Sequence, residues 1–193
     1  WSHSKRYIQV DDMHVAGDLR GQPLEALGGF SLQMPLRRTD WPTFSARDLD
    51  VSWGENHVLA NGGLTDAWDL KLDANVLDLA LIDNRVAGAL TGLVHLTGTE
   101  KRPTAVVNIK GQNLSGFDAS VKEISVAGSV AELGYVDGKL TIDVVDAKYA
   151  NQTITSAGIV ASGRREDHEL TWLVRNEQAT AQGRLHGAID LDT

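Results

Sequence analysis

The residues best suited to chemistry in this sequence are its histidines and its neighbouring carboxylates. No two histidines have the His-x-His or His-x-x-x-His spacing that places metal ligands together on one strand or helix. The acidic groups Asp11-Asp12, Asp48 with Asp50, and Glu166-Asp167 do not form a calcium loop. The sequence therefore predicts no metal site and no cofactor. The six histidines are His3, His14, His57, His95, His168 and His186.

Nucleophilic chemistry also lacks its usual residues. There is no cysteine, which excludes disulfides, thiolate metal ligands and a cysteine nucleophile. The sequence contains no Gly-x-Ser-x-Gly elbow, phosphate-binding loop or dinucleotide fingerprint. We therefore expect a protein that is not an enzyme.

Charge and hydropathy limit the partners. The 193 residues carry a net charge of −8, and the lysines and arginines are scattered, so a basic surface for nucleic acid is not expected. No apolar run approaches the roughly 20 residues that span a bilayer, so any membrane anchor should lie outside this chain. Because the chain begins at Trp1 rather than methionine, we expect it to be part of a longer protein.

The dominant pattern along the chain is a period of two, which is typical of strands. Apolar residues at Trp68, Leu70, Leu72 and Ala74 alternate with charged ones, and weaker copies lie near Phe30 and Val51. The pattern predicts about a dozen strands in a half-buried antiparallel or mixed sheet. The same alternation recurs at Ala105–Lys110, Lys139–Val144 and Glu169–Arg175.

Glycine-rich steps between these runs predict turns. They occur at Gly28-Gly29, Asn61-Gly62-Gly63, Asp137-Gly138 and Gly163–Asp167. The segment from Leu77 to Leu90 is the best candidate for a short helical turn.

The aliphatic side of such a sheet needs a cover, since no amphipathic helix is predicted to pack against it. The sheet could close as a sandwich or barrel, or stay open and curved with an apolar groove. We expect five charged residues, Asp69, Lys71, Lys110, Lys139 and Glu169, to face water. The residues predicted to line the apolar concave side are Leu70, Leu72, Val107, Ile109, Ile142, Val144, Leu170, Trp172 and Val174.

Four segments in this order resemble the TamB family within the AsmA-like bridge proteins. They are WGENHVLANGGLTDAWDLKLDA (53–74), NVLDLALIDNRVAGALTGLVHLTGTEKRPTAVVNIKGQNL (75–114), GRREDHELTWLV (163–174) and GRLHGAIDL (183–191). The second segment contains a Gly98-Thr99 … Pro103 step and a closing Gly111 … Leu114. The matching region extends from about residue 51 to residue 190.

This resemblance implies a fold and a function. It implies an all-β, elongated and curved sheet that forms a trough with an apolar concave interior. Residues 51–193 would form the TamB-like repeat region, and residues 1–50 would add uncertain N-terminal strands, expected to belong to the same sheet.

The function implied is that of a bridge held at the periplasmic face of the inner membrane and spanning the periplasm. Its groove would carry phospholipid acyl chains from the inner to the outer membrane. The alternative is a scaffold that binds strands of outer-membrane barrels or autotransporters together with the outer-membrane partner TamA.

Overall fold

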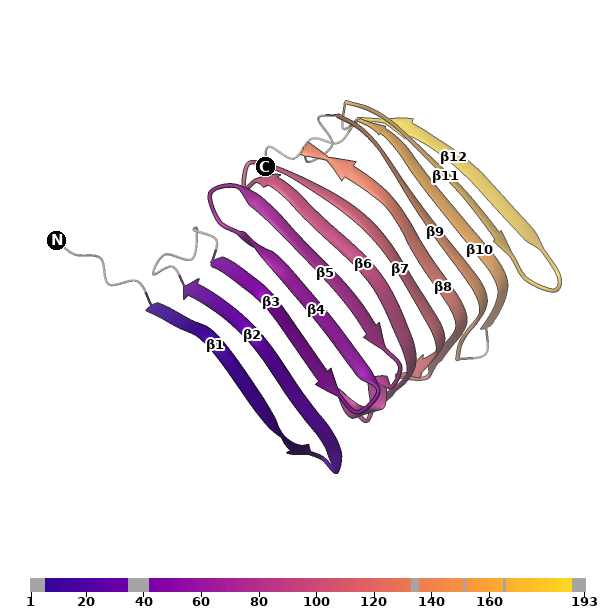
Figure 1. Cartoon of the computed structure of the whole chain (residues 1–193). Helices are drawn as coiled ribbons and strands as arrows, with labels where there is room; N and C mark the ends of the chain where they lie inside the picture. The colour runs from indigo at the N-terminus through magenta and orange to yellow at the C-terminus, as the bar shows by residue number, and fades with distance from the viewer. Residues whose placement is uncertain (1–5, 35–41, 133–135, 151, 165, 189–193) are drawn as a thin grey trace.

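Twelve antiparallel strands form one open, curved sheet in the computed structural model, which describes residues 6–34, 42–132, 136–150, 152–164 and 166–188 (Figure 1). Each strand is hydrogen-bonded to the next along the chain, so β1 and β12 are the two edges. This confirms the predicted all-β curved sheet. The strands are β1 (Arg6–Leu19), β2 (Gln22–Met34), β3 (Thr43–Trp53), β4 (Asn56–Leu64), β5 (Trp68–Val76), β6 (Val86–Thr99), β7 (Arg102–Gly116), β8 (Ala119–Ala131), β9 (Val136–Tyr149), β10 (Gln152–Arg164), β11 (Asp167–Arg175) and β12 (Thr180–Gly187).

The sheet is a single layer, and few of its side chains are buried because no second layer covers them. Among the described residues the buried apolar side chains are Ala46, Ala60, Leu70 and Val76, and no large side chain is fully buried. A sandwich would place a second sheet over the apolar rows, and a barrel would pair β1 with β12. Neither occurs in the described part of the chain.

Strand β5 shows how the sequence produces this arrangement. Leu70 and Val76 are buried, whereas Asp69, Lys71 and Asp73 are exposed. Successive strand side chains point to opposite faces, so the alternation in the sequence becomes an alternation in burial. A shift of one residue would exchange the two faces, and the pattern therefore fixes the register.

Three of the predicted turns are wrong, because their glycines lie inside strands. Gly28 in β2 and Gly62 in β4 have positive φ angles of 101° and 97°. A Cβ added at Gly62 would lie 1.8 Å from the carbonyl oxygen of Asp69, so this position requires glycine for a close strand approach. Asp137-Gly138 lies within β9, and the preceding connection falls at residues 133–135, outside the described residues.

Two local predictions are confirmed. Strand β10 ends at Arg164 and β11 begins at Asp167, which are paired across the turn expected there. The helical turn η1 (Leu79–Leu81) lies within the segment expected to form one. Asp78 caps it by accepting a hydrogen bond from the backbone N–H of Ala80 at 2.9 Å. No helix in the described part of the chain is long and apolar enough to cross a membrane.

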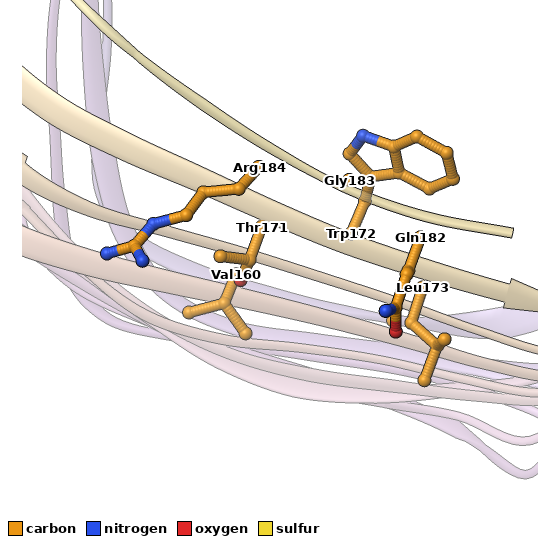
Figure 2. A pocket seen from close by; sticks show the side chains of 8 residues that line it. Val160, Thr171, Trp172, Leu173, Gln182, Gly183 and Arg184 are labelled. Atoms are coloured by element: carbon orange, nitrogen blue, oxygen red, sulfur yellow. The ribbon is translucent and has the colours of Figure 1, made fainter.

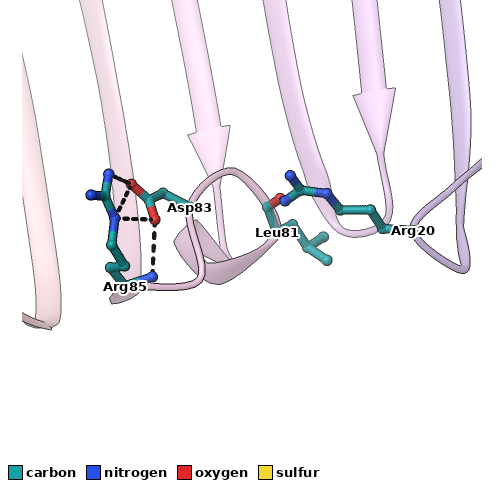
Figure 3. A network of polar contacts seen from close by, with 4 residues as sticks. All are labelled: Arg20, Leu81, Asp83 and Arg85. Atoms are coloured by element: carbon teal, nitrogen blue, oxygen red, sulfur yellow. Dashed lines mark hydrogen bonds and ion pairs between the residues drawn. The ribbon is translucent and has the colours of Figure 1, made fainter.

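Polar contacts attach η1 to the end of the sheet. Arg85 donates two-pronged hydrogen bonds to Asp83, and Arg20 in the β1–β2 turn donates to the carbonyl oxygen of Leu81 at 2.8 Å (Figure 3). The hydrogen bonds from Arg85 lower the pKa of Asp83 to about 2. Arg20 therefore ties η1 to the β1–β2 turn, and the Asp83–Arg85 pair orders the connection that leads into β6.

Asn56 provides the buried part of this attachment. Its side-chain amide donates to the carbonyl oxygen of Asp78, and its Oδ1 accepts from the backbone N–H of Asp78, both at 2.8 Å. Asn56 is only 6% exposed, so its polar atoms depend on these two bonds rather than on water.

We predict that Asn56→Ala lowers the free energy of unfolding by about 1–3 kcal/mol, because it removes two bonds and leaves backbone groups of Asp78 unpaired. Urea unfolding followed by tryptophan fluorescence measures this change. Asn75→Ala is the matched control, since Asn75 is exposed in the next strand, β5. An equal loss in both variants would contradict the assignment.

Candidate functional site

The nine residues predicted to line a groove lie on one face of the sheet, which we call the apolar face. Directly paired residues in antiparallel strands share a face. Leu72 pairs with Val94, which pairs with Val107, and the same row continues through Leu140 to Leu170. All nine side chains are buried or half-buried.

The row that contains Ile109 shows how continuous this face is. From β7 to β11 it is made of aliphatic residues and ends on Trp172, with no polar side chain in between. The row is Ile109, Val126, Ile142, Ile159 and Trp172. Cross-strand contacts between aliphatic and aromatic residues stabilise such pairs by a few tenths of a kcal/mol to about 1 kcal/mol each.

Trp172 is the last residue of this row, and its orientation shows on which side of the sheet the apolar face lies. In Figure 2 its ring points to one side of the sheet, whereas Thr171, Leu173 and Arg184 point to the other. The ring lies over Gly183 of β12, where an added Cβ would be 2.5 Å from Trp172 Nε1. Glycine at this position lets the indole cover the neighbouring strand. A hollow of about 590 Å³ lies beneath β10–β12 on the side that carries Thr171.

The opposite face, which we call the polar face, is held by charge pairs between neighbouring strands. Asp69, Lys71, Lys110 and Lys139 are exposed on it, and Glu169 is half-buried beside Arg184. The register thus places these five charged residues opposite the nine apolar ones.

Histidines supply many of these pairs, and sequence reasoning missed this role. The Nε2 atom of His57 lies 2.7 Å from Asp50, that of His95 lies 2.7 Å from Asp69, and that of His186 lies 2.8 Å from Asp167. His14 is 3.6 Å from Glu25 in the same kind of pair. The two residues of the hydrogen-bonded pairs His57–Asp50 and His95–Asp69 are 7 and 26 residues apart in the sequence. Such pairs can be found only from the strand register. His3 lies outside the described residues.

His168 differs from these histidines. It is paired opposite Gly163 and Gly187, and its Nδ1 atom is buried without a hydrogen-bond partner among the described residues. The described residues contain no group of three potential metal ligands.

A second hollow, of about 260 Å³, lies at the end of β6–β8 beside η1. Its lining is almost entirely apolar and includes Leu79, Val86, Leu114, Phe117 and Val121. Phe117 is 67% exposed at the tip of the β7–β8 turn, and the Arg85 guanidinium lies 5.4 Å from its ring centroid. Leu114 lies against Gly111 of β7, where an added Cβ would be 2.7 Å from Leu114 Cδ1.

Comparison with known proteins identifies the family of this chain. The family model described as "TamB, N-terminal domain" matches residues 1–193. The chain belongs to the TamB family. It is 24% identical over 184 residues to the "Translocation and assembly module subunit TamB" of Haemophilus influenzae, which covers 95% of this chain and 14% of that protein. The chain thus spans about a seventh of the length of this TamB relative. No solved structure matches it.

We predict that the pKa of the Asp69 carboxyl lies below its usual value of 3.8, mainly because His95 donates a hydrogen bond to it. Since the folded-state pKa is lowered, the ionised carboxylate contributes stability above the unfolded pKa and loses it as the pH falls through the lowered value. NMR titration of the carboxyl carbon in a His95→Leu variant, which has no donor at this position, should move the pKa back towards 3.8.

The control for this titration is Lys71→Gln. Lys71 is the weakest of the contributions that lower the pKa of Asp69, so its removal should change that pKa less than His95→Leu does. An identical shift in both variants would refute the hydrogen bond as the main cause.

Proposed function

We propose that this chain forms a segment of a bridge along which phospholipid acyl chains move between the inner and outer membranes. The observation that supports this most directly is the uncovered apolar face, which runs without a polar interruption from Ile109 to Trp172. In a single-layer sheet this face has no second sheet to bury it. An acyl chain would bury methylene groups against it at about 0.8 kcal/mol each.

Membership of the TamB family supports the same proposal, because the Haemophilus relative is named as a subunit of a translocation and assembly module. We place this segment in the periplasm and assign it no catalytic step. An aliphatic lining without polar anchors suits passage better than tight recognition, since each methylene group can be exchanged for the next along the row.

Burial supports a concave apolar face. On a bowed sheet, side chains converge on the concave side and diverge on the convex side. All four buried apolar residues lie on the apolar face, whereas Leu59, Leu93 and Val106 on the polar face are 40–48% exposed. The apolar face also carries exposed side chains: Ile8 and Leu185 in the outermost strands are 55% and 61% exposed, and Val130 in β8 and Ile159 in β10 are 41% and 37% exposed.

The competing candidate is a scaffold for strands of outer-membrane proteins, acting with an outer-membrane partner such as TamA. Such a scaffold would hold a client strand at a sheet edge by backbone hydrogen bonding, or within the groove. At an edge the client would use backbone groups, whereas an acyl chain contacts side chains on the apolar face.

We predict that photo-crosslinking side chains at Ile109 and Ile142 capture phospholipid in living cells. The matched controls are Asn108 and Thr141, which precede them in β7 and β9 but point to the polar face. Mass spectrometry of the adducts should find lipid at the first pair and little at the second. Peptide adducts at Ile109 and Ile142 in place of lipid would favour a scaffold that holds its client in the groove, and equal lipid labelling of both faces would refute a groove.

We also predict that Ile142→Asp leaves the sheet folded but interrupts transport. A face open to solvent lets water reach the new carboxylate, so the several kcal/mol that burial of an unpaired charge would cost are avoided. Thermal unfolding and an assay of envelope integrity measure the two effects. Thr141→Asp, on the polar face, should affect neither.

Two outcomes would count against the groove in this experiment. A folded Ile142→Asp protein that still supports the envelope would contradict transit along this row. An unfolded one would indicate that Ile142 belongs to a closed core.

A further inference from the structure

A row of alternating leucines and aspartates crosses the polar face, which is otherwise rich in charged side chains. The register aligns Leu27 of β2, Asp50 of β3, Leu59 of β4, Asp73 of β5 and Leu93 of β6 at one level. The three leucines are 38%, 40% and 48% exposed. We call these five residues the Leu–Asp row. They face away from the apolar face, so the proposed transport does not use them.

The row lies along a hollow of about 370 Å³. Asp50, Leu59, Asp73 and Leu93 line it, and the rest of its lining includes Asp48, Asn61 and Lys71. Two partly exposed leucines, Leu59 and Leu93, therefore form an apolar floor between the carboxylates of Asp50 and Asp73.

The charges around the hollow are mostly negative. Asn61 donates to Asp48, His57 pairs with Asp50 at 2.7 Å, and His95 pairs with Asp69 at 2.7 Å. Asp73 has no hydrogen-bond or ion-pair partner among the described residues, and Lys71 is the one lysine or arginine in the lining. A ligand that brings positive charge would complete the pairing.

Strand spacing defines the shape of that ligand. Neighbouring strands lie about 4.8 Å apart, so consecutive leucines of the row are about 9.6 Å apart, with an aspartate halfway. Seven residues of an α-helix rise about 10.5 Å, and three or four residues rise about 5 Å. A helix lying across the strands would thus place one side chain on a leucine at every seventh residue. The side chain three or four residues further along would lie on the aspartate between two leucines.

We propose that the Leu–Asp row docks an amphipathic α-helix of a partner protein that carries an aliphatic residue at every seventh position and lysine or arginine midway between them. A client strand would instead need a sheet edge, because the backbone groups of β2 to β6 are already paired within the sheet. A second copy of the row would bring like charge, and an anionic membrane surface would be repelled in the same way.

Fluorescence anisotropy with the protein that contains this chain tests the proposal. The probe is a labelled helical peptide of three heptads with leucine at the first position, lysine at the fourth, and alanine or glutamine elsewhere. We expect saturable binding that weakens by about tenfold or more in Leu59→Ser and with a peptide that has glutamate in place of lysine. The double variant Asp50→Lys, Asp73→Lys should reverse the preference and bind the glutamate peptide better.

Matched controls come from β9 on the same face. Val145→Ser removes an aliphatic side chain that is 39% exposed, almost the exposure of Leu59, and Asp143→Lys reverses an exposed carboxylate outside the row. Both should bind the lysine peptide as the unchanged protein does.

Four results would overturn the proposal: no saturable binding of the lysine peptide, equal binding of the lysine and glutamate peptides, equal loss in Val145→Ser, or self-association in sedimentation that Leu59→Ser abolishes. The last would assign the row to a second copy. None of these results bears on the apolar face, so the proposed transport is tested separately.

Discussion

Cross-strand register is the constraint on which the rest of this structure depends. Because the sheet is one layer, no second layer compensates for a side chain that points the wrong way. The pairing of Leu72 with Val94 and of Val94 with Val107 commits every residue in those strands to a face. The apolar rows, the charge pairs of the polar face and the Leu–Asp row all follow from the same hydrogen-bond ladders.

Much of this could be predicted from the sequence, because the strand period of two is visible in a single strand. Alternation at Trp68–Ala74 and Glu169–Arg175 was enough to predict strands and to assign Leu70 and Trp172 to the same kind of face. The local alternation needs no knowledge of neighbouring strands. The helical turn at Leu79–Leu81 lies within the segment from Leu77 to Leu90 that the sequence makes the best helix candidate.

Features that depend on two strands could not be predicted. The His95–Asp69 pair and the alternation of Leu59 with Asp73 exist only once the register between strands is known. The turn predictions at the glycines fail for a related reason. The Asn61-Gly62-Gly63 step predicts a turn, but the positive φ of Gly62 and its closeness to the backbone of Asp69 belong to an irregularity inside a paired strand. A local sequence cannot distinguish these two uses of glycine.

The meander has a consequence for how such a protein can change in length. Each strand is hydrogen-bonded to the strands that precede and follow it in the chain, so the sheet behaves as a one-dimensional array of hairpins. If two consecutive strands are removed, the chain re-enters the sheet at the same end, and every later strand keeps its direction and its apolar and polar faces. If one strand is removed, every later strand runs in the opposite direction. Divergence within such a sheet can therefore adjust its span in steps of one hairpin, about 9.6 Å, to the distance that has to be bridged.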